Sequence, residues 1–319
     1  MKTKIFTLLL IYLLNTPLFA RPAQITFIYP MGSNGIDSIT QSNELSLNIL
    51  AGLNGGLNGV EVGSILNYNN GPVKGVQVSG VANITKGTTD GVAIAGVLNL
   101  STEASSGIQV STINMGVDTF EGVSVGVINL IGTLKGVSLG VINVVDDSSE
   151  GLPIGLFSFV RNGFFALELE TTNTLLSTLN YKMGVKRFYT IIKVGYSPLG
   201  SSTLNVAGLG WGTQIALSDS SKIVLDVTSN SISDSTNSIF TADDSTYNSI
   251  NKVDINYKLH LLKNLSVFAG PSLDILVSEQ KTDGSYISVD NFSPFYTKEL
   301  SNSKLSVTFG LSVGISLEL

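Results

Sequence analysis

The chain has 319 residues, of which 43% are hydrophobic and 13% are charged, and its formal net charge is −6. It contains no Cys and one His, which excludes disulfides, thiol nucleophiles, Cys-ligated zinc, iron–sulfur clusters and His-rich metal centres. The acidic balance argues against nucleic acid as a partner, and the low charge with ample apolar content argues against disorder.

Residues 1–20 have the pattern of a secretory signal peptide. Lys2 and Lys4 precede an apolar run over residues 5–14, which is too short to cross a bilayer as a helix. Cleavage is expected after Ala20, with Ala23 as a second option. Residues 21–44 are expected to form a linker or cap, and the mature chain is expected to be exported.

An internal repeat dominates residues 45–160. The phrase recurs as GVQVSGVAN from Gly75, GVAIAGVLN from Gly91 and GVSVGVIN from Gly122, and the leading glycines lie 14 to 16 residues apart. Each unit is rich in Val and Ile and cannot bury its apolar side alone, whereas stacked units can. Gly suits a corner with an unusual backbone angle, and the closing Asn suits a stacked amide ladder.

Two architectures fit this repeat. Near-constant spacing favours a β-solenoid with about fifteen residues per unit, in which Gly75 stacks on Gly59. The alternative is a series of antiparallel hairpin strands in the wall of a barrel. In that case, successive Asn residues would alternate between opposite rims, which gives no reason for their identical chemistry.

Longer alternating strands follow in residues 161–319 and predict an antiparallel up-and-down β-barrel. From Leu305 to Leu319 every second residue is apolar, and the residues between are small or polar. We count nine segments, namely 164–170, 176–187, 188–197, 203–218, 221–230, 252–262, 264–278, 285–297 and 303–319. Bacterial single-chain barrels usually have an even number of strands, so either one segment is misassigned or the repeat supplies another.

Strand length favours an outer-membrane barrel over a soluble sandwich. A tilted strand of about 9–11 residues crosses a bilayer, whereas strands of soluble proteins are usually about 5–6 residues long. Aromatic residues near strand ends could form interfacial girdles, or they could be ordinary core or edge residues, and the aromatics alone do not decide between these. These residues are Phe188, Tyr189, Tyr196, Trp211, Tyr257, Phe268, Phe295 and Tyr296.

The repeat units GVQVSGVAN and GVSVGVIN resemble those of poorly characterised surface repeat-containing proteins of Gram-negative and spirochaete envelopes. The stretch GLPIGLFSFVRNG, followed by FYTIIKVGYSPLG, resembles the junction into the second half of those proteins. The resemblance covers roughly residues 45–280 and implies an exported envelope β protein. It supplies no catalytic residues.

Three residues match patterns of reactive groups, but their surroundings in the sequence argue against a reactive role. Ser124 and Ser138 match Gly-x-Ser-x-Gly, but Glu, Gln or Ala replaces the Ser in sibling repeats, so we expect a variable, exposed strand position. His260 lies on the polar face of a strand without neighbouring ligands, and we expect a lumen or surface residue. We therefore predict no catalytic, cofactor-binding or metal site and no cofactor.

The leading functional hypothesis is a non-enzymatic envelope or surface repeat protein at the outer membrane or cell surface of a Gram-negative-type cell. Its expected partners are outer-membrane lipid and an envelope or surface component, with a structural or adhesive role. The alternative is a barrel pore or transporter, whose lumen would be lined by residues such as Lys252, Asp254 and Lys258. A barrel hydrolase would have to rely on His260.

Overall fold

A computed structural model describes residues 22–148, 150–199, 202–234, 247–280, 285–287, 289 and 292–319. The predicted signal peptide, residues 1–20, lies outside the described residues. The protein is 75% strand, with one short 3-10 helix, η1 (Gly35–Thr40), among the described elements. None of the described residues forms a helix long and apolar enough to cross a membrane.

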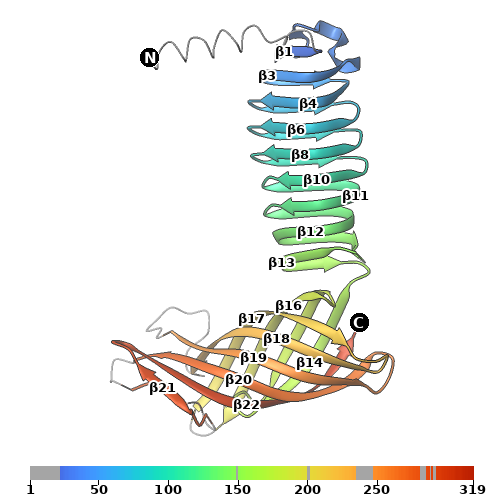
Figure 1. The fold of residues 1–319 in the computed structure, drawn as a ribbon. Coiled ribbons are helices and arrows are strands. Elements are labelled where there is room, and N and C mark those ends of the chain that lie inside the picture. Colours follow the sequence, from blue (N-terminus) through green and yellow to red (C-terminus); the bar gives the residue numbers. More distant parts are fainter. Residues whose placement is uncertain are drawn as a thin grey trace, which may run out of the picture. The chain divides into compact units, whose positions relative to one another are not determined.

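The all-β prediction is confirmed. The chain divides into residues 1–155 and residues 156–319. The first unit is a β-solenoid of about 8 turns of ~15 residues, and the second contains a closed 8-strand antiparallel barrel (Figure 1).

The solenoid contains two strands in each middle coil, and equivalent strands of successive coils pair in parallel. The strands are β3 (Ser42–Asn54), β4 (Gly56–Gly63), β5 (Leu66–Asn69), β6 (Val73–Ser79), β7 (Ala82–Thr85), β8 (Thr89–Ala95), β9 (Leu98–Ser101), β10 (Ser105–Val110), β11 (Ile113–Val125), β12 (Ile128–Asp147) and β13 (Leu152–Val160). Gly59 pairs with Gly75, and Gly75 pairs with Gly91. This parallel register confirms the solenoid and excludes the antiparallel hairpins.

The repeated glycine occupies a corner that only glycine tolerates. Gly75 has φ +125° and Gly91 has φ +140°. A Cβ on Gly91 would lie 2.0 Å from the carbonyl oxygen of Gly75. The close approach of successive coils therefore leaves no room for a side chain at these positions, and the positive φ is a second reason for Gly at Gly75, Gly91, Gly107, Gly122 and Gly136.

The repeated asparagine forms a buried ladder along the solenoid. Each Nδ2 donates to the Oδ1 of the Asn in the next coil at 2.9–3.0 Å, and the ladder also includes one Asn before the first unit. The members are Asn48, Asn67, Asn83, Asn99, Asn114, Asn129 and Asn143. Most of them also donate to a backbone carbonyl, as Asn83 does to Ile94 at 2.9 Å.

The interior of the coils is polar, which reverses one expectation. Ser124 and Ser138 were predicted to be exposed, but both are fully buried and donate to the ladder at 2.8 Å. The neighbouring Val123 and Val125 face outward instead. Alternation defines two faces without saying which is inside. Here the interior takes mostly small and amide side chains, together with some apolar ones such as Leu57, Phe120 and Leu134.

The first coil is covered by the N-terminal part of the chain. β1 (Ala23–Ile28) pairs in parallel with β3, and β2 (Met31–Gly32) pairs with β1. Gln24 is buried and lies within hydrogen-bond distance of Asn34 and Asn43. The first amide oxygen of the ladder, Oδ1 of Asn48, accepts from the Ser46 hydroxyl at 3.2 Å.

Eight antiparallel strands form the barrel, and the first pairs with the last to close it. They are β14 (Phe164–Thr172), β15 (Thr178–Val185), β16 (Phe188–Leu199), β17 (Ser202–Ala216), β18 (Ser221–Asp234), β19 (Asn248–His260), β20 (Leu265–Glu279) and β22 (Ser303–Glu318). The ninth strand of this sheet, β21 (Tyr296–Glu299), pairs with β22 alone. The predicted barrel strand over 285–297 is therefore wrong, and the even strand count holds.

The barrel wall is also polar inside and apolar outside. On β22, Ser312 and Ser316 are fully buried, whereas Leu311, Val313 and Ile315 are about half exposed or more. The alternation predicted over residues 305–319 is thus observed, with its apolar face directed away from the lumen.

Candidate functional site

The interior of the barrel holds a dense group of buried charges. Four lysines and five carboxylates from six of the barrel strands are nearly inaccessible to solvent. They are Lys182, Lys193, Lys252, Lys258, Glu168, Glu170, Asp226, Asp254 and Asp274. We call this group the lumen network, and it is the candidate functional site of the second unit.

Lys182 on β15 lies at the centre of the first half of the network. Its Nζ donates to Asp226 on β18 at 2.6 Å and lies 2.7 Å from Glu168 on β14. The hydroxyl of Tyr189 on β16 donates to the other oxygen of Asp226 at 2.6 Å. Four strands are therefore joined through one ammonium group and two carboxylates.

Lys258 on β19 extends this half across the lumen. Its Nζ donates to Glu168 and, at 3.1 Å, to the hydroxyl of Ser316 on the closing strand β22. The same ammonium lies 5.7 Å from the centre of the Phe268 ring. Glu168 thus accepts from two lysines, one on each side of the lumen.

The second half of the network lies around Glu170 and Lys252. Lys193 donates to Glu170 at 2.8 Å. Lys252 has no hydrogen-bond partner among the described residues, and its Nζ is 3.5 Å from Asp254 and 3.6 Å from Asp274. Opposite charges at these distances compensate one another electrostatically, which a buried ion requires.

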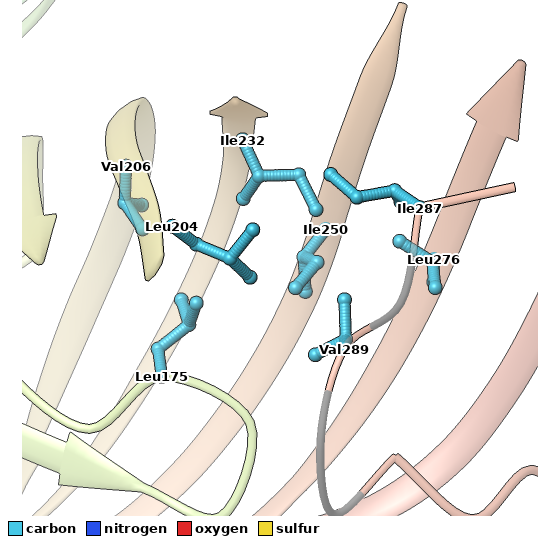
Figure 2. Packing of buried hydrophobic residues seen from close by; sticks show 8 residues of the cluster. All are labelled: Leu175, Leu204, Val206, Ile232, Ile250, Leu276, Ile287 and Val289. Atoms are coloured by element: carbon cyan, nitrogen blue, oxygen red, sulfur yellow. The ribbon is translucent and has the colours of Figure 1, made fainter. Parts of the chain in front are cut away.

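An apolar cluster occupies the end of the barrel that carries the longer connections. Leu175 comes from the β14–β15 connection, and Ile287 and Val289 come from the segment between β20 and β21. Figure 2 shows them among side chains that project from the wall. The wall residues are Leu204, Val206, Ile232, Ile250 and Leu276. The lumen network therefore lies beneath an apolar cover at this end.

A shallow depression of about 520 Å³ lies at the opposite end, beside the short turns. His260, Lys222 and Glu318 line it, together with Lys186 and Lys263. The Nδ1 of His260 is 2.7 Å from the Ser266 hydroxyl, and Lys222 donates to Glu318 at 2.9 Å. The His is thus a residue of the barrel rim.

The aromatic residues expected at strand ends differ in their exposure. Tyr196, Trp211, Tyr257, Phe295 and Tyr296 are exposed and Tyr189 and Phe268 are buried, whereas Phe188 is half-buried. The girdle interpretation is wrong for the two buried residues, because strand parity directs them inward to the lumen lysines.

The solenoid contains one buried carboxylate of note, Glu61 on β4. It accepts hydrogen bonds from Asn69 at 2.6 Å, Asn48 at 2.9 Å and Gln77 at 3.0 Å, and from Asn54. Burial raises the pKa of Glu61 above its ordinary value, and the hydrogen bonds from Gln77, Asn69 and Asn48 oppose the increase.

Sequence reasoning placed Lys252, Asp254, Asn256 and Lys258 on one polar face, and all four are buried in the barrel. It did not identify Glu168, Glu170 or Asp274 as their partners. The signal was present as charged residues at alternate strand positions, but their pairing depends on strand register. Among the described residues, no group of three or more His, Asp or Glu side chains is arranged to hold a metal ion.

Comparisons with known proteins do not assign the chain to a family. No protein-family model matches the chain, and no curated protein matches it significantly.

Proposed function

We propose that this chain is a non-enzymatic outer-membrane protein, in which the barrel is a membrane anchor and the solenoid is the part that acts in the envelope. The inverted barrel wall carries this proposal. On its outer face, Phe309 is 71% exposed, Leu311 66% and Trp211 52%, while lysines and carboxylates fill the interior.

The energetics of burial support a lipid environment. An apolar side chain that faces water lacks the stabilisation of about 25 cal/mol that burial provides for each Å² of its surface. Acyl chains provide an apolar medium in which that stabilisation is gained. Outer-membrane barrels have an outward apolar band and a polar interior. Closure of β14 on β22 pairs each of the eight wall strands with two neighbours, and the short strand β21 ends the sheet outside that wall.

The lengths of the connections between barrel strands suggest how the barrel is oriented in the membrane. Three short turns, at residues 186–187, 217–220 and 261–264, lie at the end where β14 begins and β22 ends. Outer-membrane barrels have short periplasmic turns and longer extracellular loops. By this rule, the chain enters the barrel from the periplasm, and we propose a periplasmic, structural role for the solenoid in place of surface adhesion. The basic and apolar start of the sequence supports export.

The pore alternative has less support, because the side chains of Lys182, Lys193, Lys252 and Lys258 are fully buried within the barrel. An eight-stranded barrel is wide enough only for its own side chains. We therefore expect no conductance in planar bilayers, and regular channel openings would favour the pore.

Trp211 allows a direct test, because it is the single Trp of the chain and lies on the outer face of β17. In vesicles, lipids with brominated acyl chains should quench its fluorescence strongly, and aqueous acrylamide should quench it weakly. The reverse pattern, with recovery of the protein in the soluble periplasmic fraction, would contradict the membrane anchor.

A further inference from the structure

The outer surface of the solenoid is aliphatic on the face formed by β4, β6, β8 and β10. Val62 is 42% exposed, Ile94 40% and Ile108 44%, and Val123, on the part of β11 that pairs with β10, is 38% exposed. Equivalent positions of successive coils carry similar residues, because the parallel register stacks them in columns. The result is a continuous aliphatic sheet surface.

The face formed by β5, β7 and β9 has the same character, with half-buried Leu66, Ile84 and Leu100 directed outward. The two faces lie on opposite sides of the polar interior, as the contact across it between Glu61 on β4 and Asn69 on β5 indicates. Ile65, Val81, Val97, Val127 and Val141 extend the aliphatic surface around the corner that joins the faces, and each is at least 41% exposed.

Charge is restricted to the other edge. Over residues 56–145, every charged residue except buried Glu61 lies in or beside the long turns between coils. These residues are Lys74, Lys86, Asp90, Glu103, Asp118, Glu121 and Lys135. All of them are exposed. The solenoid is therefore amphipathic across its width, with one charged edge and three aliphatic sides.

This distribution favours acyl chains over a protein as the partner. A protein partner or a second copy covers one face. A protein–protein interface contains about one hydrogen bond per 100–200 Å², and aromatic and Arg residues are enriched at the centre of the interface. Here the apolar surface continues over two opposite faces and a corner, and it is composed mainly of Val, Ile and Leu, with Tyr68 as an aromatic residue on β5. Acyl chains cover all three sides and require no hydrogen-bonding groups.

The backbone is compatible with this environment. Each middle coil pairs with the coils before and after it, so the carbonyl and amide groups of both faces are satisfied within the sheet. Backbone polar groups must be satisfied internally wherever lipid replaces water.

We propose that the solenoid is a lipid-binding, interfacial element that lies along a bilayer surface. The corner with Val81, Val97 and Val127 enters the acyl-chain region, and the charged edge remains among headgroups and water. This inference does not depend on the barrel being a membrane anchor, since it uses the surface of the solenoid alone.

Site-directed spin labelling of the full chain in phosphatidylethanolamine–phosphatidylglycerol vesicles tests the proposal. The chain has no Cys, so each introduced Cys is the single labelling site. Val97→Cys at the corner and Ile94→Cys on a face report the aliphatic surface, and Lys86→Cys reports the charged edge. Val313→Cys on the outer wall of the barrel serves as an internal reference.

The expected result is a severalfold higher ratio of oxygen to nickel-complex accessibility at residues 94 and 97 than at residue 86. Equal, water-like accessibility at residues 86, 94 and 97 would overturn the inference. Spin–spin broadening at residue 94 that disappears on dilution with unlabelled chain would also overturn it, in favour of a second copy. If residue 313 alone reports lipid, the barrel anchor stands and the solenoid inference fails.

Discussion

The solenoid and the barrel both direct aliphatic residues outward, but they stabilise their polar interiors in different ways. In the solenoid, Asn side chains of neighbouring coils hydrogen-bond to one another, and the bonded residues are 14 to 19 positions apart in the sequence. In the barrel, Lys182 reaches Asp226 across 44 residues, and Lys258 reaches Glu168 across 90.

This difference separates two routes to a polar core. A repeated neutral amide supplies both a donor and an acceptor, so it satisfies itself wherever coils stack in register. A buried charge needs an opposite charge from another strand, and that partner arrives only when the barrel closes. A single substitution in the solenoid interior should therefore lower the free energy of unfolding less than a single substitution in the lumen network.

The largest effect is expected from Lys182→Met in the barrel. This change leaves Asp226 with the Tyr189 hydroxyl but without its buried ammonium partner, and it leaves Glu168 with Lys258 alone. Breaking one partner of a buried charge pair costs about 3–5 kcal/mol. Urea unfolding in detergent, followed by Trp211 fluorescence, reports the barrel. Lys186→Met at the exposed rim is the matched control, and equal losses in both variants would contradict the role of the network.

A smaller but local loss is expected from Gly91→Ala in the solenoid. A strained backbone angle costs about 1–3 kcal/mol, and the new Cβ would also meet the Gly75 carbonyl oxygen. Hydrogen exchange of the full chain should show faster opening around β6 and β8 with an unchanged Trp211 transition. Gly116→Ala is the control, because its nearest atom would be 3.7 Å away. Unchanged protection in Gly91→Ala would argue against the observed corner.

Asn99→Ala should cost about 1–3 kcal/mol, because it leaves an N–H of Asn83 unpaired inside the ladder. Hydrogen exchange should increase in the coils that contain β7, β9 and β11, and the barrel should be unaffected. Asn70→Ala, on an exposed turn, should change little. A loss of protection spread evenly along every coil would indicate that the ladder acts as one cooperative unit.

The smallest effect is expected from Glu61→Gln, and it depends on pH. Because burial raises the folded-state pKa of Glu61, its stabilising contribution is full below the ordinary carboxyl pKa of about 4.3 and is lost as pH rises through the folded value. Gln cannot accept from all four donors of Glu61, but it stays neutral, so its destabilising effect on the first coils should be smaller at pH 8 than at pH 4. Hydrogen exchange corrected for intrinsic rates measures this, with exposed Glu103→Gln as the control. Equal effects at both pH values would contradict the shift.

The sequence alone determined the local geometry. Repeats spaced by 14 to 16 residues with a leading Gly and a closing Asn specified coils, corners and the ladder, because each feature depends on residues in adjacent units. The alternation over residues 305–319 specified a long two-faced strand for the same reason.

Only the tertiary structure decided which face became the interior and which charges met. Alternation gives two faces, but sidedness depends on how a sheet closes, so Ser124 and Ser138 were wrongly assigned to the surface. The strand count depended on closure of β14 with β22, which leaves β21 outside the eight-stranded wall. The contact between Lys258 and Glu168 depended on the register of strands far apart in the chain, and no local pattern encodes that register.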